Sequence, residues 1–136
     1  MKGQLSVEYL IVVGFALLMT IPTVIIFFSQ SNSNIESVNN AQAQIVVRKI
    51  IDSAEKVYYL GPPSQTRIKA TMPAGIENIT ITNRAIKVTM ISSGGQNDIV
   101  EGSDVNITGN LSAISGTVYI KIQSIGDTVN ITYDNS

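Results

Sequence analysis

The sequence predicts an α+β protein of lollipop form, in which one long N-terminal helix packs, over its C-terminal half, on an antiparallel β-sheet or sandwich head. Three observations predict this fold class. Residues 10–28 form an apolar run without a charged residue. Apolar residues then recur at helical spacing as far as Gly61. From Arg67 onward the apolar period changes to two, which is typical of half-buried strands.

The amino-acid composition excludes several kinds of chemistry. The 136 residues include no His and no Cys, and the formal net charge is −1. Disulfides, ordinary structural zinc sites and Ser-His-Asp or Cys-His catalytic units therefore lack their essential residues. The near-neutral charge gives no electrostatic case for nucleic acid as a partner. The sequence thus predicts a protein that is not an enzyme and has no catalytic residue, no metal site and no cofactor.

Acidic residues in one later segment raise the question of calcium. Asp98, Glu101 and Asp104 follow each other closely, and carboxylate oxygens are calcium ligands. Their spacing does not match the known calcium-binding loop, so we expect a solvated acidic loop instead.

The segment over residues 9–28 is predicted to span a membrane. As a helix, the uncharged run 10–28 would reach about 28 Å, close to the ~30 Å hydrocarbon core of a bilayer. A cleaved secretory signal peptide is the alternative, but its apolar region is shorter, and Phe27–Gln30 is a poor small-x-small cleavage site. Lys2 and the α-amine precede the span, so the N-terminus should stay cytoplasmic and the rest should face outward.

Two residues within this helix have predicted structural effects. Pro22 removes one helical hydrogen bond and crowds the carbonyl of Leu18, so a kink or local loosening is expected near residues 19–22. Gly14 allows the backbone of a neighbouring helix to approach closely.

The helix is expected to continue beyond the membrane segment. The polar stretch Ser29–Asn34 is the place where it is free to bend or break, and Gly61-Pro62-Pro63 should end it. Between them charged residues occupy one face, and the opposite face has apolar residues at spacings of three and four. This predicted stripe, which needs a cover, is Ile35, Val38, Ala41, Ile45, Val46, Ile50, Ala54, Val57 and Tyr58.

The C-terminal part is expected to contain about six or seven short strands. Apolar and polar residues alternate over residues 78–82, 86–90, 118–123 and 129–133. Turn residues separate the strands at 73–75, 83–84, 93–95, 109–110, 116 and 126–127. The natural cover for the inward face of these strands is the amphipathic part of the helix.

The segment that leads into the apolar helix is Lys2-Gly3-Gln4-Leu5-Ser6-Val7-Glu8-Tyr9-Leu10. It resembles the precursor segment of archaeal type IV pilins with a class III signal peptide, whose pattern is a basic residue and Gly, then Gln-x-Ser-x-Glu-Tyr-Leu. Val57–Pro63 also looks like the end of the pilin helix in this group. The resemblance implies cleavage between Gly3 and Gln4 by a prepilin peptidase. It divides the chain into a signal peptide (1–3), a helix (4–61) and a β-rich head (62–136).

The resemblance also implies a function. The chain would be the structural subunit of an archaeal type IV adhesion pilus, a helical homopolymer whose core is the apolar helix. Its partners would be copies of itself, the prepilin peptidase, a pilus assembly ATPase and a membrane platform. The precursor would lie in the cell membrane with its head outside, and the filament would be extracellular. The alternatives are a non-polymerising membrane-anchored surface binding protein, an archaellin-like filament subunit and an envelope enzyme, which the missing His and Cys disfavour.

Glu8 is a carboxylate at the mouth of an otherwise uncharged apolar helix. A charge within hydrocarbon costs about 2.5–3.5 kcal/mol on insertion scales, so away from water it needs a partner. After cleavage, the new α-amine of Gln4 would lie one turn away in the same chain and be equally available from a neighbouring chain. Our hypothesis is that Glu8 neutralises the amine of an adjacent subunit. The alternative is a carboxylate facing the helix dipole, worth about 0.3–1 kcal/mol.

Four Asn-x-Ser/Thr tripeptides are candidate acceptors for N-linked glycans in a translocated protein. In the predicted strands, each Asn and its hydroxyl residue lie on the polar face and the middle residue points inward. Alternating Asn and Thr also make a good exposed strand face without any glycan. The candidate acceptors are Asn78, Asn106, Asn110 and Asn130.

Overall fold

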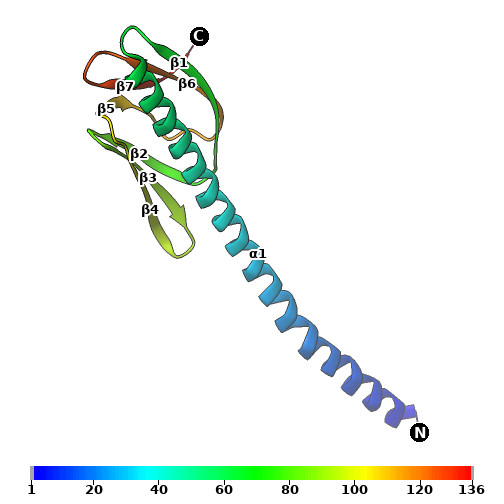
Figure 1. Cartoon of the computed structure of the whole chain (residues 1–136). Helices are drawn as coiled ribbons and strands as arrows, with labels where there is room; N and C mark the ends of the chain where they lie inside the picture. The colour runs from blue at the N-terminus through cyan, green and yellow to red at the C-terminus, as the bar shows by residue number, and fades with distance from the viewer. Residues whose placement is uncertain (1, 136) are drawn as a thin grey trace. The chain divides into compact units, whose positions relative to one another are not determined.

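The computed structural model describes residues 2–135 (Figure 1). Met1, which belongs to the predicted signal peptide, lies outside the described residues, as do Ser136 and the side chain of Lys2. The chain divides into two compact units, residues 1–36 and residues 37–136. The first unit is helical, and the second contains the rest of the same helix and all the strands. The predicted α+β class, with a long N-terminal helix packed on a β-sheet head, is confirmed.

A single helix, α1, extends from Lys2 to Leu60. It is unbroken at Pro22 and across residues 29–34, so the interruption considered for that polar stretch is not present. The hydroxyls of Thr20 and Thr23 donate to the carbonyls four residues earlier, at 2.7 and 2.8 Å, which satisfies these polar groups within the apolar segment. The helix ends where Gly61 adopts a φ of 77°, as glycine readily does at helix C-termini.

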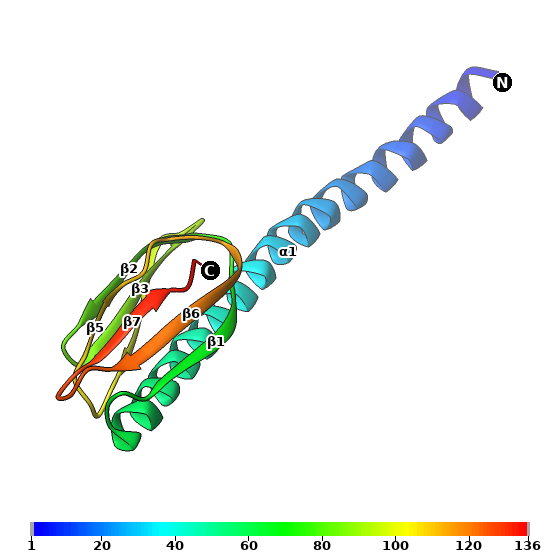
Figure 2. The same cartoon turned by 90° about the horizontal axis from the view of Figure 1, so that it is seen from above.

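In the part of the chain that the structure describes, seven strands follow and form two sheets (Figures 1 and 2). The strands are β1 (Gln65–Met72), β2 (Ile76–Thr82), β3 (Ala85–Ser92), β4 (Gly95–Gly102), β5 (Ile107–Asn110), β6 (Gly116–Ser124) and β7 (Val129–Tyr133). The four-stranded sheet has the order β1-β6-β7-β5, and the three-stranded sheet is the meander β2-β3-β4. All strand pairs except one are antiparallel.

The exception is the parallel pair β5–β7, and it corrects the expected turn at Gly109-Asn110. Both residues lie in β5, where Gly109 pairs with Ile131. Gly109 has a φ of 148°, and a Cβ built on it would lie 1.9 Å from the carbonyl oxygen of Ile131. Here glycine permits close approach of two strands rather than reversal of the chain.

The expected acidic loop is also wrong, because Asp98 and Glu101 lie in strand β4. Lys87 pairs with Asp98 at 2.7 Å and, with a hydrogen bond from Thr89, lowers the pKa of that carboxyl. The side-chain amide of Gln44 in α1 donates a hydrogen bond to the carboxylate of Glu101 at 2.8 Å. Among the residues that the structure describes, no group of three or more Asp and Glu side chains is placed to hold a metal ion.

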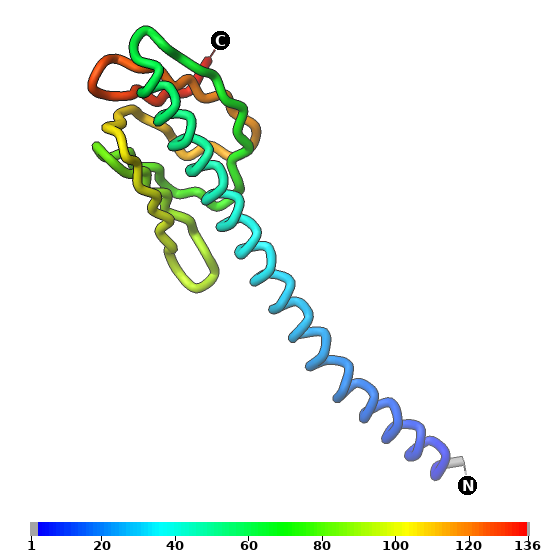
Figure 3. The backbone as a smooth tube through the Cα atoms, viewed as in Figure 1, coloured from blue at the N-terminus to red at the C-terminus, as the bar shows by residue number. Residues whose placement is uncertain are grey.

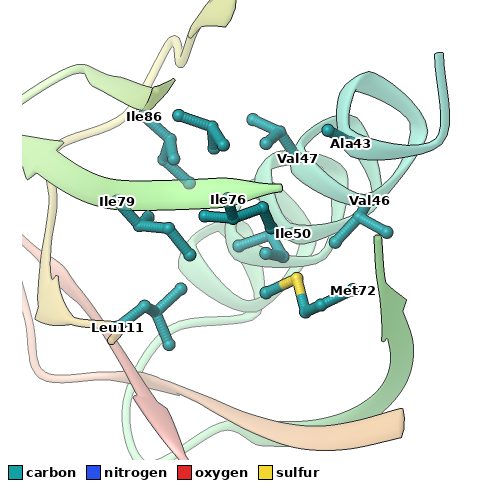
Figure 4. Close-up of a pocket in the computed structure, with 10 residues that line it drawn as sticks. Ala43, Val46, Val47, Ile50, Met72, Ile76, Ile79, Ile86 and Leu111 are labelled. Atoms are coloured by element: carbon teal, nitrogen blue, oxygen red, sulfur yellow. The ribbon is translucent and has the colours of Figure 1, made fainter. Parts of the chain in front are cut away.

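The core of the second unit lies between α1 and the inward faces of both sheets (Figure 2). The helix supplies Ala43, Val46, Val47, Ile50, Ile51, Ala54 and Val57 to this core. The strands supply mainly Ile79, Ile86, Val88, Met90, Ile107, Ile120, Ile122, Val129 and Ile131. A wholly apolar cavity of about 10 Å³ remains between α1, the strands β1 to β3 and Leu111 (Figure 4). It is at the lower limit of what one water molecule needs and has no polar lining, so it is a packing defect.

Polar side chains of α1 also bind the sheets at their margins. Gln42 donates to the carbonyl of Thr71 at 3.1 Å, and Lys49 donates to the carbonyl of Lys69 at 2.8 Å. Both acceptors are backbone groups of β1, which is an edge strand of its sheet. The helix therefore covers an edge that would otherwise offer unpaired carbonyls to another chain.

Replacement of Ile50 by Ala is expected to destabilise the second unit by about 2–5 kcal/mol, because it opens a cavity at the centre of the core. Ile50 is 2% exposed, whereas Ile45 on the same helix is 67% exposed. Ile45→Ala is the matched control and should change the free energy of unfolding by less than about 0.5 kcal/mol. Urea unfolding of the full chain in detergent, followed by tyrosine fluorescence, measures both; equal effects would contradict the assigned helix face.

Gly109→Ala is expected to destabilise the second unit by about 3 kcal/mol or more, because the added methyl group meets the backbone of β7. Gly94→Ala is the control, since no atom lies within 4 Å of the Cβ position there. The same unfolding measurement compares the two variants. A Gly109→Ala protein as stable as the control would exclude the close parallel pairing of β5 with β7.

Candidate assembly helix and acceptor sites

The N-terminal part of α1 exposes its apolar side chains on every face. None of the described side chains from Gly3 to Glu36 is buried. The large apolar residues from Leu5 to Phe28 are 45–70% exposed, apart from Val13, which is half-buried. By length and composition, this helix can cross a membrane. A helix that is apolar all round is stable only when lipid or other protein surrounds it.

Glu8 projects from the first turns of this apolar surface. Its side chain is exposed, and it makes no hydrogen bond or ion pair with any residue that the structure describes. Gln4, the predicted mature N-terminus, is also exposed and lies one helical turn before it. The chain thus carries a carboxylate without a partner beside the position where cleavage would create an amine.

Gly14 leaves one position on the helix without a side chain. No atom outside the helix backbone lies within 4 Å of its Cβ position. Nothing in the chain opposes the approach of another helix there, as expected of a small residue at a helix–helix contact. The roles of Gly14, Pro22, Gly3, Gln4 and Glu8 stay predictions from the sequence.

The exposure of three apolar residues of α1 corrects part of the predicted stripe. Ile35, Val38 and Ile45 are 58–67% exposed, whereas Ala43, Val47 and Ile51, which the stripe omitted, are buried. Within the second unit, Val38 and Ile45 lie at helical spacing on the face of α1 turned away from the sheets. The sequence pattern did not distinguish this outer stripe from the inner one because both have helical spacing.

The four acceptor tripeptides share one local arrangement. The middle residues Ile79, Ile107, Leu111 and Ile131 are buried. The acceptors Asn78, Asn106 and Asn110 are exposed, and Asn130 is half-buried. The predicted alternation is therefore present at all four tripeptides. In the parallel β5–β7 pair, Thr108 lies beside Asn130, and Asn110 lies beside Thr132. The tripeptides that begin at Asn106, Asn110 and Asn130 therefore share one sheet face.

A cationic and aromatic surface occupies another part of the same sheet face. The guanidinium of Arg67 lies 4.4 Å from the ring centre of Tyr119 and pairs with Asp134 at 2.8 Å. Lys121 stands beside Arg67 in the β1–β6 register. Arg67, Lys121 and Asp134 line a hollow of about 390 Å³, and Tyr119, against which Arg67 stacks, is 42% exposed. A ring flanked by cations is suited to bind anionic or saccharide groups. Sequence reasoning missed this surface because its residues come from three separate segments.

Comparison of the chain with protein-family models gave no match, and neither did comparison with curated proteins or with solved structures.

Replacement of Leu17 by Asp is expected to reduce membrane association, because a carboxylate near the centre of a spanning helix costs about 2.5–3.5 kcal/mol. Ser31→Asp places the same charge outside the apolar run and should leave the distribution unchanged. Alkaline extraction of membranes, followed by immunoblotting of pellet and supernatant, measures the fraction that stays bound. Equal fractions for the two variants would contradict the membrane assignment of residues 9–28.

Proposed function

We propose that this chain is the pilin subunit of an archaeal type IV adhesion pilus. The observation that carries the proposal is the apolar surface of α1 between Leu5 and Phe28, which is exposed on every face. Such a surface needs a cover, and lipid can provide one before assembly. After assembly, copies of the same helix can cover this surface in place of lipid. One segment then serves both as membrane anchor and as filament core.

The N-terminal residues support the same function. Cleavage between Gly3 and Gln4 removes Lys2 and creates an α-amine at Gln4. The Glu8 carboxylate has no partner among the described residues, and a neighbouring subunit's amine would neutralise it. Because a buried charge without a partner is costly, each incoming subunit is held at the axial position that joins the two charges.

The second unit remains outside the membrane in this proposal. The outward faces of its strands carry many polar residues, among them Asn78, Thr80, Thr108 and Asn110. A prepilin peptidase, an assembly ATPase and a membrane platform complete the pathway that the N-terminal motif implies.

A second candidate function is that of a membrane-anchored binding protein that does not polymerise. The exposed Tyr119, the stacked Arg67 and the neighbouring Lys121 favour it, because they form a surface suited to a ligand. In that case α1 would serve only as an anchor. The two functions predict different N-termini and different surface structures.

The test compares sheared surface material from cells that carry the native chain, Glu8→Ala or Asp127→Asn. Asp127→Asn removes the same charge from an exposed loop of the second unit and is the matched control. We expect the native chain and the control to give filaments whose subunits begin at Gln4, and Glu8→Ala to give at least tenfold fewer. Electron microscopy counts the filaments, and N-terminal sequencing identifies the processed end.

Two results would contradict the proposal in different ways. Glu8→Ala filaments of normal number and length would exclude the charge-pairing role of Glu8. A native chain that keeps Met1 and forms no filaments would favour the non-polymerising binding protein.

A further inference from the structure

A shallow hollow lies beside one of the four acceptor asparagines. Its volume is about 300 Å³, at the lower end of the range for small-ligand sites. Three segments that are distant in the sequence meet there: the β2–β3 turn, the start of β5 and the β6–β7 loop (Figure 3). The lining residues are Asn83, Asn106, Ile107, Thr108, Ile125 and Thr128.

Backbone hydrogen bonds fix the walls of this hollow. The amide of Ile107 donates to the carbonyl of Asn83 at 2.9 Å, which joins the start of β5 to the β2–β3 turn. The amide of Ile125 donates to the carbonyl of Thr128 at 3.0 Å and closes the β6–β7 loop. A ligand would therefore meet a largely formed surface, with little loop ordering required on binding.

Asn106 differs from the other three acceptors in its backbone setting. It precedes β5, whereas Asn78 lies in β2, Asn110 ends β5 and Asn130 lies in the central strand β7. The backbone of Asn106 accepts one hydrogen bond from the neighbouring strand, from the amide of Val129 at 3.0 Å. Asn130 is paired with strands on both sides, so Asn106 is the easier of the two for a modifying enzyme to reach in the folded protein. By the same argument, half-buried Asn130 is the least accessible.

The hydrogen bonding of the Asn106 side chain also suits a glycan acceptor. Its amide oxygen accepts a hydrogen bond from Nε of Arg84 at 3.4 Å. Its amide nitrogen, the atom that receives a glycan, makes no hydrogen bond with the described residues. At Asn78, by contrast, the amide nitrogen donates to the hydroxyl of Thr80.

We propose that Asn106 is the principal glycan acceptor of this chain and that the hollow beside it seats the first saccharide. The inference rests on the proposed function only in requiring that the second unit be translocated. Ile125 is 58% exposed and offers an apolar surface to the C–H face of a sugar ring. Thr108, Thr128 and Asn83 offer hydroxyl and amide groups to its hydroxyls.

The modification is a transfer from a lipid-linked oligosaccharide activated at C1 by a phosphate ester. The amide nitrogen of Asn106 attacks C1, and a C–N bond forms. The bond between C1 and the phosphate oxygen breaks, and the lipid phosphate leaves with the electron pair. The amide nitrogen loses one proton, which the leaving lipid phosphate takes up, so the product is a neutral N-glycosyl amide.

The test uses full-length protein isolated from its native host, and from the same host without its oligosaccharide transferase. Mass spectrometry of peptides gives the occupancy of each acceptor, and thermal unfolding gives Tm for both forms. Ile125→Ser removes the apolar wall of the hollow but leaves the acceptor tripeptide intact. Ile91→Ser is the matched control, because Ile91 is also 58% exposed and lies on β3, outside the hollow.

We expect the highest occupancy at Asn106 and the lowest at Asn130. Ile125→Ser should lower Tm of the glycosylated protein by about 2–4 °C more than it lowers Tm of the unglycosylated protein. Ile91→Ser should change both forms equally. An unmodified Asn106 would overturn the proposal, and so would an Ile125→Ser effect that is the same with and without glycan. Filaments counted in the same material report on the proposed function separately.

Discussion

The fold of residues 37–136 depends on one constraint, which is that a single helix must cover the inward faces of two sheets. Ile86 of one sheet and Ile120 of the other are both fully buried in one core to which α1 contributes Ile50. Removal of the helix would expose that core to water, at roughly 25 cal/mol per Å² of apolar surface. Small residues such as Ala43 and Ala54 on the inner face of α1 let the sheets approach it closely. The two sheets and the helix segment are therefore not independent structures, because each buries the apolar face of the others.

Much of this arrangement could be predicted from local patterns, and the failures have physical causes. Gly61-Pro62-Pro63 marks the end of α1 because it cannot continue a helix, and alternation reveals strands such as 86–90 and 118–122. The sequence pattern did not predict strand β4, because Gly95–Gly102 is an edge strand with few apolar residues that could alternate with polar ones. Gly109-Asn110 has the composition of a turn, and it forms part of a strand only because it pairs with the distant strand β7. Long-range pairing of this kind leaves no local trace in a single sequence.

The candidate sites also differ in how much of each could be predicted from the local sequence. A tripeptide reveals an acceptor asparagine, and the alternation around it correctly predicts a buried middle residue. The hollow beside Asn106 needs three distant segments, so no local pattern contains it. Glu8 is the opposite case. Its position in an uncharged helix is evident from the sequence, but its proposed partner belongs to another chain. For Gly14 likewise, the open space on the helix is visible, and what fills it is a property of the assembly.

The exposed apolar residues outside the first unit favour different partners. Val38 and Ile45 lie on the outer face of α1, where they extend a helical apolar surface suited to another helix. Ile125 lies alone in a loop among hydroxyl and amide side chains. A helix of a second copy would bury those polar groups without partners, at a cost of about 1–3 kcal/mol each. A saccharide presents both hydroxyls and C–H groups, so it can satisfy the polar side chains while covering Ile125. The chemistry around Val38, Ile45 and Ile125 therefore supports the proposal that the outer stripe of α1 contacts protein and that the hollow takes carbohydrate.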